Sequence, residues 1–168
     1  PPPPPTTPCG YKVSSAGCQA APGCGYAKFW INDVQISAPN GRGLNVVVVD
    51  PSTFAVVETQ RFDTYRWGWA AKAFYEFLAA TAEERPNFTV LVAVKDEAQN
   101  RAGVGGSQNV YAAMRKFLGA GSYAYPGPRC FRCSYALVAR IDKSGGDLLI
   151  SREATDRRTI VTANWMHE

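Results

Sequence analysis

The sequence has very little of the side-chain chemistry on which most enzymes depend. It contains a single histidine, His167, which is the penultimate of its 168 residues. A general base has to be held firmly beside its nucleophile, and residues at chain ends are usually poorly ordered. The adjacent acids Asp96 and Glu97 are expected to be solvated charges, because glycosidase chemistry needs two carboxylates that face each other across a cleft. We therefore expect no catalytic residue, no metal site and no enzyme activity.

Motifs for nucleotides and long apolar runs are also missing. Gly41-Arg42-Gly43 precedes an apolar run, whereas a phosphate-binding glycine loop follows a strand and opens a helix. The glycines at 103–106 are not followed by the Lys-Ser/Thr of a P-loop. No apolar run approaches the ~18–20 residues that span a bilayer, and no charged-then-apolar leader opens the chain. We therefore expect that the protein binds no cofactor and has no membrane span. We also expect that the sequence is a mature or excised fragment.

The charge of the chain is modest and scattered. Eighteen Lys and Arg residues against fourteen Asp and Glu give a net charge of +4, and only Arg152, Arg157 and Arg158 form a loose basic group. A nucleic-acid-binding protein concentrates its basic residues along one element. The pattern predicts a solvated basic surface and no nucleic-acid partner.

Five cysteines are present: Cys9, Cys18, Cys24, Cys130 and Cys133. A zinc site needs four ligands at paired spacings, which Cys18 and Cys24 do not offer. A redox Cys-x-x-Cys opens a helix, but an apolar strand-like run follows Cys133. The pattern favours structural disulfides that pin an irregular N-terminal segment to a distant part of the core. One cysteine is left unpaired or available to another chain.

The chain opens with a proline-rich segment. Consecutive prolines followed by Thr6-Thr7-Pro8 predict a semi-rigid polyproline II rod that acts as a tether. In a secreted protein this rod offers candidate sites for hydroxyproline and O-linked sugar, at Pro1, Pro2, Pro3, Pro4 and Pro5. Asn87-Phe88-Thr89 is a candidate N-glycosylation site at Asn87.

A folded domain is expected from Ala27 onward. Alternating or continuous apolar runs predict strands, and three- and four-residue apolar spacing predicts helices. The expected strands cover 29–36, 44–49, 54–62, 88–95, 134–141, 147–151 and 159–165, and the expected helices cover 69–85 and the stretch from the N-cap Ser107 to Gly119. The composition therefore predicts a mixed α/β (α+β) domain, with about six or seven strands in sheets packed with two or more helices. We divide the chain into a linker (1–8), a cysteine-rich segment (9–26) and this domain (27–168).

An ordered set of motifs across residues 27–146 resembles the ILEI/PANDER-like domain family. The motifs begin with Gly41-Arg42-Gly43-Leu44-Asn45-Val46 and continue, in order, with Arg61-Phe62-Asp63-Thr64-Tyr65, Phe74-Tyr75-Glu76-Phe77-Leu78, Val94-Lys95-Asp96-Glu97-Ala98, Met114-Arg115-Lys116-Phe117-Leu118-Gly119 and Phe131-Arg132-x-Ser134-Tyr135, where x is any residue. The resemblance implies a compact domain of strands and helices in a secreted or cell-surface protein. Related domains occur in cytokine-like proteins and in the sugar-binding stem of an O-mannose N-acetylglucosaminyltransferase.

By this resemblance, sugar contacts fall on Asp96 and Arg132, with Phe131 and Tyr135 as an apolar face beside them. A carboxylate can accept hydrogen bonds from sugar hydroxyls, and a guanidinium can donate to ring or acetamido oxygens. The alternative interpretation of Asp96 and Arg132 is a local ion pair between two loops. Cys130 and Cys133 stand where the family usually has glycine and aspartate, so a disulfide can reshape this site.

Three hypotheses for the function follow. The first is a non-catalytic extracellular or cell-surface module that binds a glycan or a partner protein and that the proline rod attaches to a larger proline-rich glycoprotein. The second is a self-associating structural subunit of an extracellular matrix, cell-wall or surface fibre, favoured by the odd cysteine and by Trp67 and Trp69. The third is a secreted cytokine-like ligand.

Overall fold

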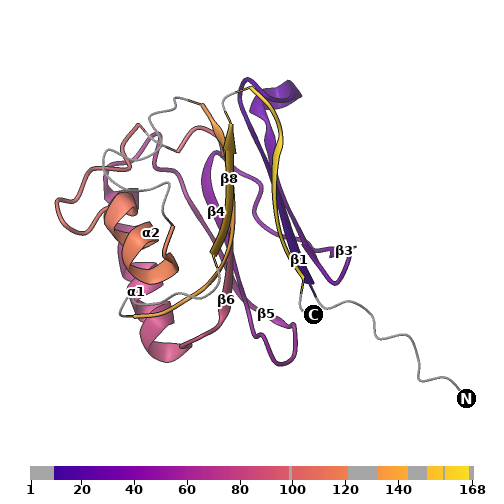
Figure 1. Cartoon of the computed structure of the whole chain (residues 1–168). Coiled ribbons are helices and arrows are strands. Elements are labelled where there is room, and N and C mark those ends of the chain that lie inside the picture. The colour runs from indigo at the N-terminus through magenta and orange to yellow at the C-terminus, as the bar shows by residue number, and fades with distance from the viewer. Residues whose placement is uncertain (1–9, 99, 121–131, 144–150, 157, 167–168) are drawn as a thin grey trace, which may run out of the picture.

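The protein has three layers in the computed structural model, which describes residues 10–98, 100–120, 132–143, 151–156 and 158–166 (Figure 1). Two helices form one layer, and strands form the other two. The elements are β1 (Gly10–Gly17), the short 3-10 helix η1 (Pro22–Cys24), β2 (Tyr26–Ile31), β3 (Val34–Gln35), β4 (Gly43–Val49), β5 (Val56–Phe62), α1 (Trp69–Glu84), β6 (Thr89–Asp96), α2 (Val110–Leu118), β7 (Ser134–Arg140), β8 (Ser151–Asp156) and β9 (Val161–Met166). This mixed α+β architecture is the predicted fold class.

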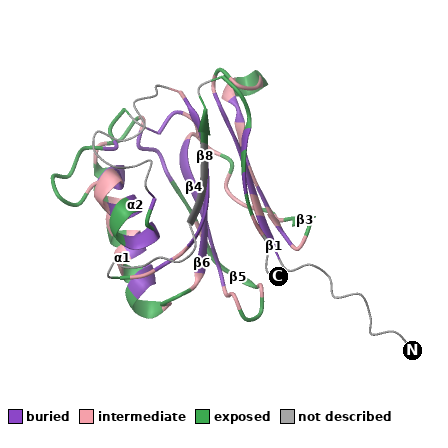
Figure 2. Cartoon of the chain, in the orientation of Figure 1, coloured by how far each residue is buried: buried purple, intermediate pink, exposed green. Residues whose placement is uncertain are grey.

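The middle layer is an antiparallel sheet in the order β5-β4-β6-β7-β8. Its β4, β6 and β7 strands are buried on both faces (Figure 2). In β4, Val46 and Val48 pack against the helices, while Val47 and Val49 pack against the second sheet. The continuous apolar run of β4 predicted this two-sided burial, because alternate side chains of a strand point to opposite faces.

The helices α1 and α2 cover one face of the middle sheet through the apolar stripes that the spacing predicted, with Phe74, Leu78, Met114 and Leu118 in the core. Helix α2 ends at Gly119, which adopts the left-handed conformation predicted for a C-terminal glycine. The predicted N-cap Ser107 is wrong. The Asn109 side chain caps the helix instead, by accepting a hydrogen bond from the Ala112 N–H at 2.9 Å.

The second sheet, in the order β3-β2-β1-β9, packs on the other face. The expectation of an irregular segment over 9–26 is wrong for β1, whose Tyr11 and Val13 are fully buried. Glycine, proline and cysteine around β1 obscured its alternation of apolar and small polar residues. The strand predicted over 29–36 is a hairpin of β2 and β3, turned at Asn32 and Asp33, which both have positive φ.

The two sheets join where β1 runs parallel to the end of β6, with Ala16 opposite Lys95 and Gly17 opposite Asp96. This junction sets the position of the site described below. The predicted strand over 147–151 lies outside the described residues except for Ser151, which begins β8. The last predicted strand corresponds to β9.

Neither helix of the described residues is both long and apolar enough to cross a membrane.

Candidate functional site

Two of the residues assigned to sugar binding come together at the junction of the sheets. Asp96 is the last residue of β6, and Arg132 lies just before β7. The Nε atom of Arg132 is 3.9 Å from Oδ1 of Asp96, and the two side chains are 37% and 19% exposed. The structure thus contains the expected ion pair, at the surface of the molecule.

The backbone at both residues is unusual. Asp96 has φ of 61° and Arg132 has φ of 60°, in the left-handed region that costs a non-glycine residue ~1 kcal/mol or more. Such conformations persist where the surrounding structure determines them, and they are concentrated at functional sites. Here the Arg132 N–H donates to Oε2 of Glu97, a carboxylate that is fully buried.

The burial of Glu97 corrects the interpretation of Asp96 and Glu97 as two solvated charges. Only Asp96 reaches the surface, whereas the buried Glu97 accepts a hydrogen bond from the backbone N–H of Arg132. Local sequence could not separate the two acids, because β6 ends at Asp96 and the alternation of a strand no longer applies.

The end of β1 presses against the same segment. A Cβ atom on Gly17 would lie 2.1 Å from the carbonyl oxygen of Arg132, so only glycine fits there. The Gly17 N–H donates to Oγ of Ser134 at 2.8 Å, and Oγ of Ser15 accepts from the Tyr135 N–H at 2.9 Å. The segment that carries Arg132 is therefore fixed to β1.

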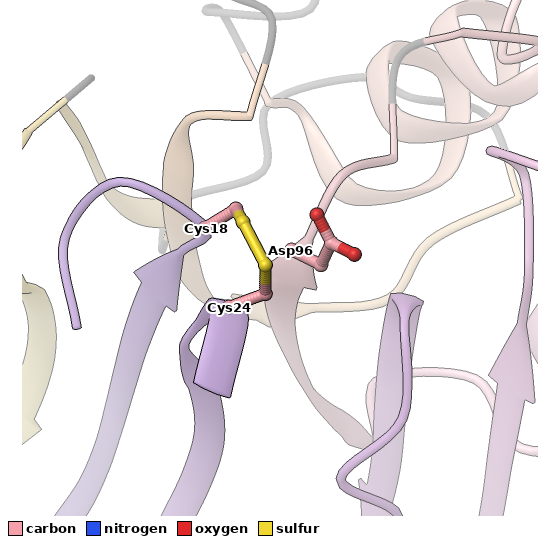
Figure 3. Close-up of side chains that lie close together, drawn as sticks. All are labelled: Cys18, Cys24 and Asp96. Atoms are coloured by element: carbon pink, nitrogen blue, oxygen red, sulfur yellow. A yellow bond between two sulfur atoms is a disulfide. The ribbon is translucent and has the colours of Figure 1, made fainter. Parts of the chain in front are cut away.

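A disulfide between Cys18 and Cys24 borders Asp96 (Figure 3). The Cys18 N–H donates to the carbonyl oxygen of Asp96 at 3.3 Å, and Nη1 of Arg132 lies 3.4 Å from Sγ of Cys18. The two sulfurs and the Asp96 carboxylate lie within 4.8 Å of one another. While the disulfide is intact, its sulfurs are not thiolate ligands, so this group does not form a metal site.

The disulfides only partly follow the expectation. Cys18–Cys24 closes a short loop within the N-terminal segment and does not pin that segment to a distant part of the core. Cys133 also forms a disulfide, with a partner outside the described residues. Cys9 and Cys130 themselves lie outside those residues.

The buried oxygen of Asp96 is the most informative atom of the site. Oδ1 is shielded from solvent and accepts no hydrogen bond from the described residues, because 3.9 Å from Arg132 Nε is beyond hydrogen-bond distance. A shielded acceptor without a donor costs ~1–3 kcal/mol. The Asp96 carboxylate therefore keeps unused capacity to accept hydrogen bonds.

The structure describes only one of the other two residues assigned to the sugar surface. Tyr135 is buried in the core against the helices, because it belongs to β7 and its side chain points inward. We therefore leave Tyr135 out of the ligand surface. Phe131 lies outside the described residues.

A second arginine–aspartate pair lies nearby and explains two of the motifs. Arg42 donates to both carboxylate oxygens of Asp63, with Nη2 at 2.8 Å from Oδ2 and Nε at 3.1 Å from Oδ1. Asp63 also accepts the Arg66 N–H at 3.1 Å. Burial acts to raise the pKa of Asp63, but the hydrogen bonds from Arg42 and Arg66 and the charges of Arg42 and Arg61 outweigh it, so the pKa is lowered.

Comparison with known proteins identifies the family of this chain. The family described as interleukin-like EMT inducer (ILEI) matches residues 42–143, more than half of the 168 residues. The chain belongs to the ILEI family. Among curated proteins, none matches it significantly.

Membership of the ILEI family makes this an extracellular protein, and an intramolecular disulfide fits that environment. The domain is of a cytokine-like or binding type, and ILEI is not a known enzyme family. The matched range contains Asp96 and Arg132, whereas the Cys18–Cys24 disulfide and strands β1–β3, β8 and β9 lie outside it.

Proposed function

We propose that this ILEI domain is an extracellular binding module that recognises a glycan at the Asp96–Arg132 pair. The observation that carries the proposal is the separation of this pair: the two side chains are both partly exposed, and Arg132 Nε and Asp96 Oδ1 lie 3.9 Å apart, beyond hydrogen-bond distance. Sugar hydroxyls are donors that suit a carboxylate with spare acceptor capacity, and a guanidinium donates to ring or acetamido oxygens. A ligand hydroxyl that donates to the exposed part of the Asp96 carboxylate forms a charge-assisted hydrogen bond.

The rigid surroundings support the proposal. The Glu97 carboxylate and the close approach of Gly17 fix the backbone of Arg132, and the Cys18 N–H beside the disulfide bonds to the backbone of Asp96, before any ligand arrives. A site that is ordered in advance loses little conformational entropy on binding. Phe131, the neighbour of Arg132 in sequence, remains the proposed apolar contact for the sugar ring.

The proposed module includes β1. We now set the start of the domain at Gly10, since β1 pairs with β2, β9 and β6, and we keep residues 1–8 as the proposed tether. Asn87 is exposed between α1 and β6, which suits the proposed N-linked sugar. Hydroxylation of Pro1–Pro5 remains part of the proposal.

A glycan array with the full chain tests the function. We expect Asp96→Ala and Arg132→Ala each to reduce retention by roughly tenfold to a hundredfold, the usual effect of losing a charged hydrogen bond. Glu58→Ala is the matched control. Glu58 also forms an acid–arginine ion pair, with Arg85 at 2.7 Å, but it lies in β5 and not at the junction of the sheets. Retention of no sugar, or equal retention by all variants, would remove the glycan site and favour a protein ligand.

A further inference from the structure

A second surface of the molecule exposes two tryptophans. Trp67 is 42% and Trp69 is 68% exposed, and their rings stack with centroids 6.4 Å apart. The exposed Val104 lies against Gly68 between them, 3.3 Å from the position of a Gly68 Cβ. We call Arg66, Trp67, Trp69 and Val104 the tryptophan patch. Clustered exposed aromatic side chains are typical of surfaces that bind other proteins.

The loop that carries the patch is held rigidly. The Trp67 N–H donates to the carbonyl oxygen of Asp63 at 3.0 Å, and the Arg101 N–H donates to that of Thr64 at 2.8 Å. The Asp63 side chain, itself anchored by Arg42, accepts the Arg66 N–H. Since the backbone of this loop is fixed before binding, little backbone entropy is lost when a partner covers the patch.

The chemistry of the patch suits a proline-rich segment. Stacked tryptophans offer flat apolar surface for pyrrolidine rings, and aromatic surfaces are the common means of binding polyproline II helices. The backbone of such a helix has no internal hydrogen bonds, so its carbonyl oxygens can accept from the indole N–H groups and from Arg66. The Arg66 guanidinium lies over the Trp67 ring, 4.6 Å from its centroid.

The chain itself contains such a segment. Residues 1–8 read Pro-Pro-Pro-Pro-Pro-Thr-Thr-Pro, for which the sequence predicts a polyproline II helix. With three residues in each turn, Pro2, Pro5 and Pro8 fall on one edge at intervals of about 9 Å. This edge presents a row of proline rings to an aromatic surface.

Residues 1–8 leave the domain at the end opposite to the tryptophan patch. They precede Gly10, the first residue of β1, whereas the other end of β1 meets Asp96 at the junction. The patch lies near that junction, because Thr64 Oγ1 donates to the carbonyl oxygen of Ala98 at 2.7 Å. The eight residues of β1 span about 25 Å.

The patch also lies in a different layer from β1. Trp69 begins α1 in the helix layer, and the middle sheet separates that layer from β1 (Figure 1). Packed layers are about 10 Å apart, which adds about 20 Å. Residues 1–9 span about 28 Å as a polyproline II helix, so they cannot reach the patch of their own chain and also lie along it.

We propose that the tryptophan patch binds residues 1–8 of a second copy of this chain, head to tail. The binding segment and the patch are different surfaces at opposite ends of the domain, so each bound copy leaves one segment and one patch available. Contacts of this kind form open chains unless the rotation between copies closes a ring. The proposal is independent of the glycan site, because the patch shares no residue with it, and it gives the fibre hypothesis a specific contact.

Sedimentation velocity over a concentration series tests this with the full chain. We expect the mass to rise with concentration. The association should weaken by roughly thirtyfold in Trp67→Ser/Trp69→Ser, the effect of losing a tryptophan anchor. A second variant that carries Gly-Ser repeats in place of residues 1–8 should lose it equally. The matched control is Ile160→Ser, an exposed apolar residue of another segment, which should associate like the wild type.

Mixing the two defective variants is the sharpest measurement. One keeps the proline segment and the other keeps the patch, so the mixture should form a dimer and nothing larger, although each variant alone stays monomeric. A chain that is monomeric at every concentration, or association that persists in both variants, would overturn the proposal. So would binding of the free peptide PPPPPTTP without self-association, which would assign the patch to a separate proline-rich chain. Non-reducing gels detect disulfide-linked dimers, so that these are not mistaken for association through the patch.

Discussion

The two arginine–aspartate pairs of this domain have the same side chains but different geometry. Arg42 meets Asp63 through two short hydrogen bonds, and Asp63 is only 7% exposed. Arg132 lies 3.9 Å from Asp96, beyond hydrogen-bond distance, with a buried carboxylate oxygen that accepts no hydrogen bond from the described residues. The first pair is satisfied within the domain, while the second keeps capacity for a ligand.

The difference between the two pairs shows that the surrounding backbone decides whether an arginine and an aspartate form hydrogen bonds with each other. The Arg66 N–H and the Arg42 guanidinium both donate to the Asp63 carboxylate, so both of its oxygens are bonded within the fold. Asp96 and Arg132 are held at positive φ by backbone contacts with β1 and Glu97, and their side chains form an ion pair without reaching hydrogen-bond distance. The same residue types thus stabilise the fold at one position and remain available for recognition at the other.

The largest expected effect comes from the satisfied pair. Asp63→Ala removes the partner of Arg42 and the acceptor of the Arg66 N–H, so we expect a loss of ~2–3 kcal/mol in the free energy of unfolding. Urea denaturation measures this, with Asp63→Asn as a milder variant that keeps one acceptor oxygen. A variant as stable as the wild type would show that the Arg42–Asp63 pair does not hold this turn.

The disulfide beside the other pair gives a somewhat smaller effect. Replacing Cys18 and Cys24 together by serine should cost ~2 kcal/mol in the loop-entropy model for so short a loop, and it should weaken glycan retention because the disulfide borders Asp96. No hydrogen bond or ion pair of the described residues joins Arg42 or Asp63 to this disulfide, so acid sensitivity should be unchanged. Unaltered glycan retention would mean that β1 alone positions Asp96.

Acid should act on the Asp63 pair in a predictable direction. The pKa of Asp63 is lowered in the folded state, so its contribution is fully present above its unfolded-state pKa of ~3.9. That contribution is lost as the pH falls through the lower folded-state pKa. The stability difference between the wild type and Asp63→Asn should therefore shrink below about pH 4. A difference that stays constant over this range would contradict the ionic role of Asp63.

The smallest effect on stability is expected at the candidate site. Asp96→Asn should change the free energy of unfolding by no more than ~1 kcal/mol, since a partly exposed ion pair at 3.9 Å contributes little, while glycan retention falls. Thermal unfolding measures the change in stability and the glycan array measures the change in retention, so the two effects are separated. A loss as large as that of Asp63→Ala would make both pairs structural and would end the distinction between them.

Local pattern was enough for much of the fold but not for all of it. The apolar run of β4, the helical stripe around Phe74 and Leu78, and the left-handed Gly119 each follow from periodicity or backbone preference over a few residues. The strand β1 was missed because glycine, proline and cysteine surround it. The N-cap moved from Ser107 to Asn109 because the turn before the helix continues, with the Gln108 N–H bonded to the carbonyl oxygen of Gly105.

The sequence by itself determined the layered class of the domain and its family, since both depend on short-range patterns and on the order of motifs. Only the tertiary structure decided that Glu97 is buried, that Tyr135 faces the core, and that β1 and its disulfide border Asp96. These outcomes depend on contacts such as Gly17 with Ser134, which are 117 positions apart. Contacts of that range leave no local signal, because either residue could take many other partners until the sheets close.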